Sequence, residues 1–248
     1  LILAEKLLGV SQTTYGLTFD AALHLGTLVA IFWYFKKELY RLFRSIRIPE
    51  GELSDKKNIE LLKLMLIGTV PAVILGLLFE DAVDTLFRSP QIVAVSLILF
   101  SGVLYYVEKV GKKLKDISKL NLLDGFVIGC AQAVALIPGV SRSGITIAAG
   151  MWRNLKREDS ARFAFLLSAP IVAGAGGVKL LKTLNQYSSG GITNADLTFF
   201  AVGMISAGIF GYFTIKYFLN FLARHTLYIF IVYRVILGIL VLGISYGL

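Results

Sequence analysis

This sequence has too few charged residues for a water-soluble protein. Only 17% of its 248 residues are charged and 56% are hydrophobic, against about 25% and 45–50% in an ordinary soluble domain. The mean hydropathy is +0.73, and one soluble core of this length cannot bury so much apolar surface. The composition excludes a soluble enzyme and a disordered chain, and it indicates an integral membrane protein.

Cysteine and acidic residues are also scarce. The single cysteine, Cys130, cannot form an internal disulfide, which excludes a disulfide scaffold. Lys and Arg number 25 against 16 Asp and Glu, so the formal net charge is +9. In a membrane protein this excess is typical of basic loops held against an anionic cytoplasmic leaflet, and we expect no nucleic-acid partner.

The chain begins at Leu1, and no basic segment with a cleavage site precedes its first apolar run. We therefore expect a single integral membrane domain over 1–248 that is incomplete at its N-terminus.

Six apolar runs reach the roughly 20 residues that a spanning helix needs once their flanks are added. None has a clean polar face, which favours buried or lipid-facing helices over surface helices. Pro71 and Pro170 lie inside two of the runs, as membrane helices tolerate. The predicted spans are 17–35, 61–79, 91–107, 163–181, 197–219 and 227–247.

A seventh apolar stretch, 125–151, is interrupted at its centre by Pro-Gly-Val-Ser-Arg-Ser-Gly at 138–144. Cytoplasmic loops collect Lys and Arg, and both flanks of this stretch are basic: 108–124 holds five lysines and 152–162 holds four Lys or Arg. If the stretch crossed the membrane, one basic flank would lie outside. We therefore predict a re-entrant helical hairpin over 125–151 with its break near mid-membrane.

The other connections follow the same rule. Eight Lys and Arg place 36–63 inside, whereas 80–90 and 182–196 hold one each and are predicted outside; 220–226 returns inside. The expected fold class is an all-α polytopic membrane protein with six spanning helices plus one re-entrant helical hairpin.

The break carries groups suited to an anion. Arg142 lies far from any loop, where a guanidinium costs roughly 3 kcal/mol or more, and its planar fork suits phosphate or carboxylate oxygens. Ser141 and Ser143 add hydroxyls, while Gly139 and Gly144 let the backbone turn and approach a ligand. Successive N–H groups in such a turn form an anion-binding nest. Alternatively, these residues only allow tight packing, and Arg142 pairs with a buried carboxylate.

Other polar residues in the apolar runs leave alternatives open. Gln132 either binds the ligand or ties the hairpin to a neighbouring helix. Asp124 is expected to cap the first arm, and Arg234 to reach the inner surface or to pair with a carboxylate. For His24 we favour packing or hydrogen bonding over proton transfer.

A stripe of small residues, Gly203, Ala207 and Gly211, indicates close helix–helix approach. Internal packing and a homodimer face both fit this spacing.

Four stretches resemble the bacterial undecaprenyl-pyrophosphate phosphatase family, and similarity runs over essentially the whole chain. The most specific stretch, 129–146, contains the Pro-Gly-x-Ser-Arg-Ser-Gly sequence and resembles the second signature of that family. The others are 18–28, 71–77 and 163–170.

The resemblance implies a multi-pass enzyme of the bacterial inner (plasma) membrane that hydrolyses undecaprenyl pyrophosphate, a polyprenyl pyrophosphate lipid, to undecaprenyl phosphate and phosphate. This reaction recycles the lipid carrier of peptidoglycan synthesis and confers bacitracin resistance. Arg142 would clamp the pyrophosphate, and Ser141 would contact or attack the reacting phosphate. The implied substrate-binding residues are Gln132, Gly139, Ser143, Gly144 and Thr146.

One feature of the family has no counterpart here. Its fold is an inverted repeat with two re-entrant hairpins, and the first is glutamate-rich and ends in a Ser-Ser-Thr-Gly-His type sequence. That hairpin supplies the ligands of a divalent cation (Mg²⁺ or Ca²⁺) and a histidine. Residues 1–6 are similar to the family segment directly after that histidine, so the resemblance implies that the first hairpin is missing and that this chain alone is inactive.

Three other classes of membrane protein are alternatives. A secondary transporter or lipid flippase also uses inverted repeats and broken helices and stays open on this sequence; it predicts an ion-coupling site and no phosphate release. Phosphatases of the phosphatidic-acid type place a histidine a few residues after the arginine, and none lies between Arg142 and His225. The isolated Arg142 argues against a non-catalytic structural protein.

Overall fold

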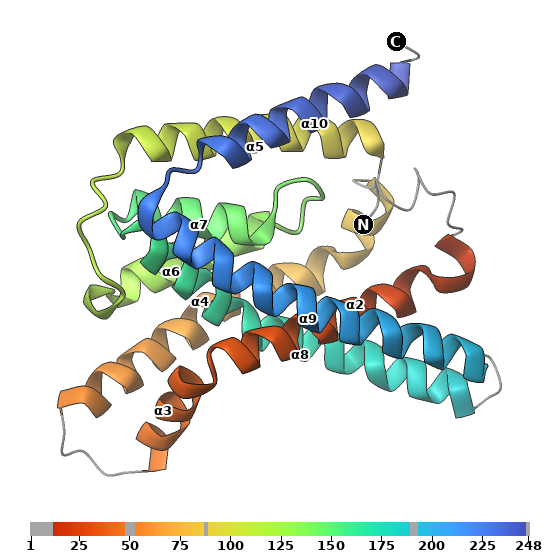
Figure 1. Ribbon diagram of the computed structural model, residues 1–248, viewed down its shortest axis with the longest axis horizontal. Coiled ribbons are helices and arrows are strands. Elements are labelled where there is room, and N and C mark those ends of the chain that lie inside the picture. Colours follow the sequence, from red (N-terminus) through yellow and green to blue (C-terminus); the bar gives the residue numbers. More distant parts are fainter. Residues whose placement is uncertain (1–11, 48–52, 87–88, 189–192, 247–248) are drawn as a thin grey trace. The chain divides into compact units, whose positions relative to one another are not determined.

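The computed structural model consists of helices and their connections, with no β-strand, in the residues that it describes, which are 12–47, 53–86, 89–188 and 193–246 (Figure 1). This confirms the all-α class. The helices are α2 (Gln12–Tyr34), α3 (Lys36–Arg47), α4 (Leu53–Leu86), α5 (Pro90–Val110), the short η1 (Ile117–Lys119), α6 (Leu122–Val134), α7 (Arg142–Trp152), α8 (Arg157–Ser188), α9 (Asn194–Arg224) and α10 (Tyr228–Tyr246).

Five helical segments are long and apolar enough to cross a membrane, counted over the described residues alone. They coincide with five of the six predicted runs, which confirms a polytopic membrane protein. The sixth run, 17–35, falls in α2, where Ala22–Tyr34 is a shorter apolar segment. The five segments are Lys56–Phe79, Pro90–Val110, Arg157–Asn185, Asp196–Arg224 and Tyr228–Tyr246.

Several helices extend beyond the apolar runs into stretches expected to be connections. The stretch 36–63 holds α3 and the start of α4. Helix α3 buries Leu39 and Leu42 while Arg41 and Arg44 stay exposed, so it is amphipathic. A search for uninterrupted apolar runs misses such a helix because its apolar residues recur only once or twice per turn.

The chain divides into two compact units, one formed by residues up to 39 with 168–218, the other by 40–167 with 219–248. In the first unit, the stripe of small residues on α9 packs against α2. A Cβ atom on Gly26 would lie 2.2 Å from the carbonyl oxygen of Met204 and 2.8 Å from the Cβ of Ala207. Gly203 and Gly211 likewise face Phe19 and Ala30, so the structure assigns this stripe to internal helix packing.

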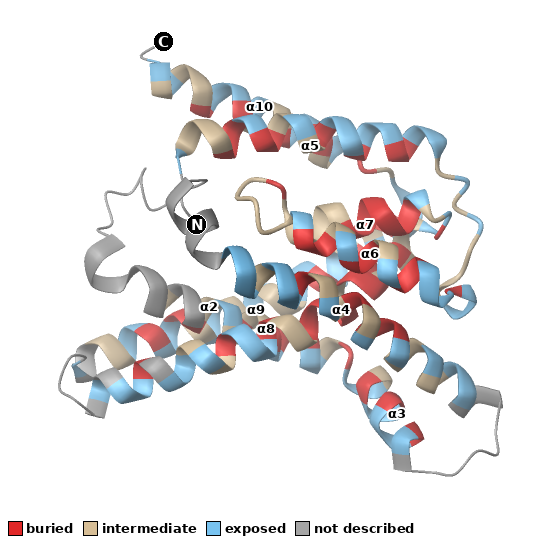
Figure 2. Ribbon diagram, turned by 180° about the vertical axis from the view of Figure 1, so that it is seen from behind, coloured by how far each residue is buried: buried red, intermediate tan, exposed pale blue. Residues whose placement is uncertain are grey.

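In the second unit, α6 and α7 form a helical hairpin, and residues 135–141 join them (Figures 1 and 2). Helix α6 packs against α4, α7 packs against α5, and α5 in turn packs against α10. The α4–α6 contact is close because Gly129 lies against Gly68: a Cβ atom on Gly129 would come within 2.4 Å of the Gly68 carbonyl oxygen.

Ion pairs join the start of α6 to the end of α7 at the base of the hairpin. The side chain of Asp124, near the start of α6, accepts a hydrogen bond from Nε of Arg153 at the end of α7, at 2.7 Å, and another from Lys115. The cap of α6 is Asn121, not Asp124 as expected: Asp124 stands three residues further on, where its carboxylate accepts from the Asn121 N–H at 3.0 Å in a capping box. The two ends of 125–151 therefore lie next to each other, the geometry that a hairpin requires.

We predict that Asp124→Asn lowers the stability of the protein. Its side chain is fully buried, so removing its charge leaves two cations without their partner, at a cost of about 2 kcal/mol or more. Thermal unfolding in detergent measures the change. The control is Asp116→Asn: Lys156 lowers the pKa of Asp116 through a hydrogen bond, but both side chains are exposed and the loss should be small. Equal losses in the two variants would contradict this account of the hairpin.

Candidate functional site

The turn between α6 and α7 has a backbone that few residues can adopt. Gly139 has φ +94°, and a Cβ atom there would lie 2.4 Å from the carbonyl oxygen of Val93 on α5. Ser141 has φ +72° and ψ +110°, a region that non-glycine residues rarely occupy. Such strain persists only where the surrounding structure enforces it, and it is concentrated at functional sites.

Ser141 also begins α7. Its Oγ accepts a hydrogen bond from the Gly144 N–H at 3.2 Å, and its carbonyl accepts from the Ile145 N–H at 3.0 Å. Helix α7 therefore starts at Arg142, inside the interrupted segment 138–144. The first N–H groups of a helix have no carbonyl partner within it, and they carry the positive end of its dipole. This end of α7 faces the turn and suits an anion.

Arg142 is the first residue of α7 and is partly buried. Within the part of the chain that the structure describes, no carboxylate pairs with its guanidinium and no carbonyl accepts from it. The alternative in which Arg142 pairs with a buried carboxylate thus finds no support among the described residues. The guanidinium keeps its hydrogen-bond donors available for a ligand.

Gln132 is buried on α6, with 3% of its surface exposed. Neither its side-chain oxygen nor its nitrogen has a hydrogen-bond partner among the described residues. A buried amide without partners costs about 1–3 kcal/mol. The expected tie from Gln132 to a neighbouring helix is not seen, and the amide is free to bind a ligand or a water molecule.

The remaining predicted residues differ in their freedom to bind. Gly139, Ser143 and Gly144 lie within the turn or in the first turn of α7 together with Ser141 and Arg142. Thr146 lies one turn further along α7 and is buried. Its hydroxyl donates to the carbonyls of Arg142 at 2.8 Å and Ser143 at 3.1 Å, so its hydrogen is committed to the helix.

The sequence did not identify the partner of Arg234. This buried residue of α10 donates from Nη2 to the carbonyl oxygens of Gly139 at 2.9 Å and Val140 at 3.1 Å, and from Nε to Ser101 Oγ at 3.3 Å. Irregular backbone leaves carbonyls that need donors, and a guanidinium offers five N–H groups in one plane. Arg234 therefore bonds to the backbone of the turn, and the expected carboxylate partner is not seen among the described residues.

The groups in the turn do not fit a divalent cation. Such ions take carboxylate and carbonyl oxygens, whereas the turn offers a guanidinium, hydroxyls and N–H groups. Across the described residues, no cluster of three or more His, Cys, Asp or Glu is placed to hold a metal ion. The glutamate-rich hairpin that the resemblance implies has no counterpart in these residues, and His24 belongs to the other compact unit.

The helices and the composition define the class: a polytopic membrane protein, whose strained turn presents hydroxyls and an arginine that has no partner among the described residues. The model of the family described as bacitracin resistance protein BacA matches residues 1–240. The chain belongs to this family.

Curated relatives are similar to this chain over nearly its whole length. An undecaprenyl-diphosphatase of Elusimicrobium minutum is 42% identical over 98% of this chain and 88% of its own length. Relatives with the same name from Rubrobacter xylanophilus and Moorella thermoacetica are 42% and 39% identical, over 97% and 92% of this chain and 88% and 83% of their own lengths.

We predict that Arg234→Met loosens the turn. The substitution keeps an apolar side chain of similar length but leaves the carbonyls of Gly139 and Val140 without donors, at about 1–3 kcal/mol for each buried group. Hydrogen–deuterium exchange should become faster in a peptide that covers 135–144. The matched control, Arg224→Met, changes an exposed arginine at the end of α9 and should leave this exchange unchanged. Unchanged exchange in Arg234→Met would contradict the assignment.

Proposed function

We propose that the turn between α6 and α7 is the pyrophosphate site of this protein. The activity follows from the family: the chain is an undecaprenyl-diphosphatase, which hydrolyses undecaprenyl pyrophosphate to undecaprenyl phosphate and phosphate. This activity supports peptidoglycan synthesis and bacitracin resistance. The observation that carries the site assignment is Arg142, which has no partner among the described residues and stands at the N-terminus of α7.

Arg142 clamps the pyrophosphate in this proposal. Its fork can donate two parallel hydrogen bonds to phosphate oxygens, stronger than those between neutral groups. The first N–H groups of α7 add donors at the same place. Water attacks the terminal phosphorus, the bond from that phosphorus to the bridging oxygen breaks, and undecaprenyl phosphate leaves. Donors fixed in place before the reaction stabilise the negative charge that develops on the transferred group.

Ser141 acts as a ligand in this proposal and not as the nucleophile. Its Oγ accepts from the Gly144 N–H, which leaves its own hydrogen free to donate to a phosphate oxygen. A serine nucleophile needs a base within hydrogen-bond reach, and no described residue supplies one to Ser141.

The other predicted residues shape or extend the site. Gly139 lets the turn approach α5 closely, Gly144 lets a ligand approach the first turn of α7, and Ser143 supplies a second hydroxyl. Thr146 braces the first turn of α7 through its bonds to two carbonyls. Gln132 offers the unpartnered amide on the other arm of the hairpin.

We also propose that the hairpin is re-entrant and enters the bacterial inner membrane from the cytoplasm. Its two ends lie together, and the flanks 108–124 and 152–162 hold nine Lys and Arg against five Asp and Glu. The turn at the opposite end of α6 and α7 would then reach the interior of the membrane. Non-helical backbone is tolerated there only when protein or water surrounds it, and the bonds from Arg234 meet that condition.

We predict that Arg142→Ala lowers phosphate release from undecaprenyl pyrophosphate by about 100-fold or more, the usual effect of removing one donor to a developing oxyanion. Arg142→Lys keeps the charge but loses the fork, and an intermediate rate is expected. The assay uses the whole protein in detergent micelles with a phosphate-detecting dye. Arg224→Ala, at an exposed arginine of α9, serves as the control. If the folded Arg142→Ala variant released phosphate at the wild-type rate, the proposed site would be wrong.

A further inference from the structure

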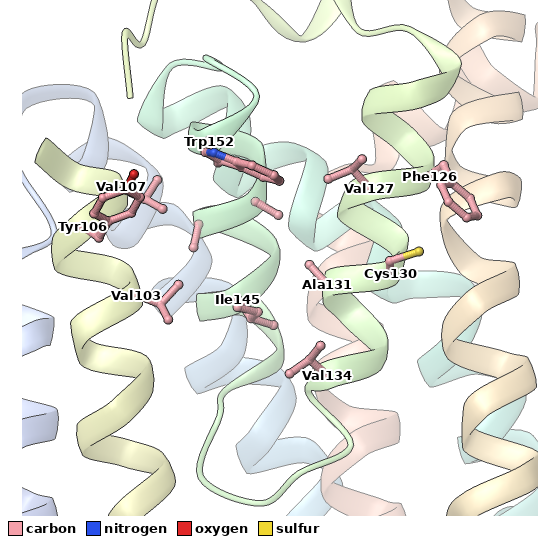
Figure 3. A pocket seen from close by; sticks show the side chains of 12 residues that line it. Val103, Tyr106, Val107, Phe126, Val127, Cys130, Ala131, Val134, Ile145 and Trp152 are labelled. Carbon is pink, nitrogen blue, oxygen red and sulfur yellow. The ribbon is translucent and has the colours of Figure 1, made fainter. Parts of the chain in front are cut away.

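An apolar groove of about 480 Å³ lies between α5, α6 and α7 (Figure 3). Its volume is in the range of small-molecule sites, roughly 300–1,000 Å³. No charged residue lines it, and of its lining side chains only those of Tyr106, Trp152 and Cys130 carry a polar atom. The proposed pyrophosphate site does not by itself account for this groove.

The groove begins at the turn that carries Arg142. Figure 3 shows Val134 and Ile145 at the end of the groove where α6 and α7 join the turn, and Trp152 towards the opposite end. Ile145, Ala149 and Trp152 follow Arg142 by three, seven and ten residues. These positions share one face of a helix, so the face of α7 that begins with Arg142 continues as a wall of the groove.

Small side chains keep the groove open. Ala131 on α6 and Ala148 and Ala149 on α7 line it, where larger apolar residues would close the space between the arms. From Arg142 to Trp152 the wall is about 15 Å long, at 1.5 Å per helical residue. The aromatic rings at the far end, Tyr106 and Trp152, combine an apolar body with a polar tip, as residues at a membrane surface commonly do.

We propose that this groove holds the first isoprene units of the substrate's polyprenyl chain. The inference rests on the proposed pyrophosphate site. A lipid whose pyrophosphate is held by Arg142 must direct its hydrocarbon chain away from the turn along an apolar surface, and the groove begins at that turn. Attachment to the bound headgroup also gives this chain an advantage over free bilayer lipids, because its effective concentration at the groove is high.

Cys130 gives a direct test, because it is the single cysteine of the sequence, is exposed and lines the groove. Undecaprenyl phosphate, the product lipid, should slow alkylation of Cys130 by a maleimide several-fold in detergent micelles. Inorganic pyrophosphate and phosphatidylglycerol should not. Equal protection by phosphatidylglycerol would show that the groove holds ordinary bilayer lipid, and no protection by undecaprenyl phosphate would also overturn the proposal.

The matched control moves the cysteine to another exposed apolar position. In Cys130→Ser/Leu240→Cys, the thiol stands on α10, at a residue that is 56% exposed and does not line the groove. Undecaprenyl phosphate should leave its alkylation rate unchanged. Equal slowing at Leu240→Cys would mean that the lipid acts on the micelle and not in the groove.

A kinetic test separates the groove from the proposed function. Ala131→Phe partly fills the groove and should raise KM for farnesyl pyrophosphate about tenfold while kcat stays near the wild-type value, since a few methylene groups in an apolar pocket carry this much discrimination. Leu240→Phe should change neither constant. If Ala131→Phe left KM unchanged while Arg142→Ala abolished phosphate release, the groove proposal would fail and the proposed function would stand. If a folded Arg142→Ala variant released phosphate normally, the proposed pyrophosphate site would be wrong, and the groove proposal, which rests on it, would be wrong too.

Discussion

The structure depends on the need to satisfy irregular backbone inside an apolar protein. The turn between α6 and α7 leaves helical geometry at two left-handed residues, Gly139 and Ser141, and its carbonyls need donors from elsewhere. Arg234 provides them from α10 and also bonds to Ser101 on α5. One arginine thus holds the turn, while a second, Arg142, has no partner among the described residues and is the proposed ligand-binding group.

The opposite end of the hairpin is fixed by two buried carboxylates. Asp124 joins the two arms through Arg153. Glu108, at the end of α5, accepts from Nε of Arg157 at 2.9 Å and from the N–H of Leu227 at 3.3 Å. It therefore joins the start of α8 and the segment before α10 to α5. With its base held by ion pairs and its turn held by Arg234, the hairpin cannot shift along its neighbours without breaking buried polar contacts.

The sequence predicted features that depend on composition and failed on those that depend on partners. The interrupted apolar stretch located the helical hairpin of α6 and α7, because it is a property of one segment. The re-entrant path, which the charge counts favour, stays a prediction. The amphipathic α3 was not predicted, because it contains no continuous apolar run. The N-cap of α6 is Asn121 and not Asp124, because a capping box places the acidic residue three positions inside the helix. The partner of Arg234 could not be predicted, because every residue has a backbone carbonyl and the sequence does not show which carbonyls lack a donor. The sequence also left open whether Gly203 packs inside the protein or at a dimer face, because the answer depends on which helix faces it.

In the proposed site, Arg142 binds the pyrophosphate group directly. The most direct measurement is the affinity of the whole protein for an undecaprenyl methylene-bisphosphonate, whose P–C–P bridge resists hydrolysis. Loss of a charge-assisted hydrogen-bond pair weakens binding by about tenfold or more, so Arg142→Gln should show this loss, while Arg224→Gln, at an exposed arginine, should bind like the wild type. Equal affinity for wild type and a folded Arg142→Gln variant would contradict the account.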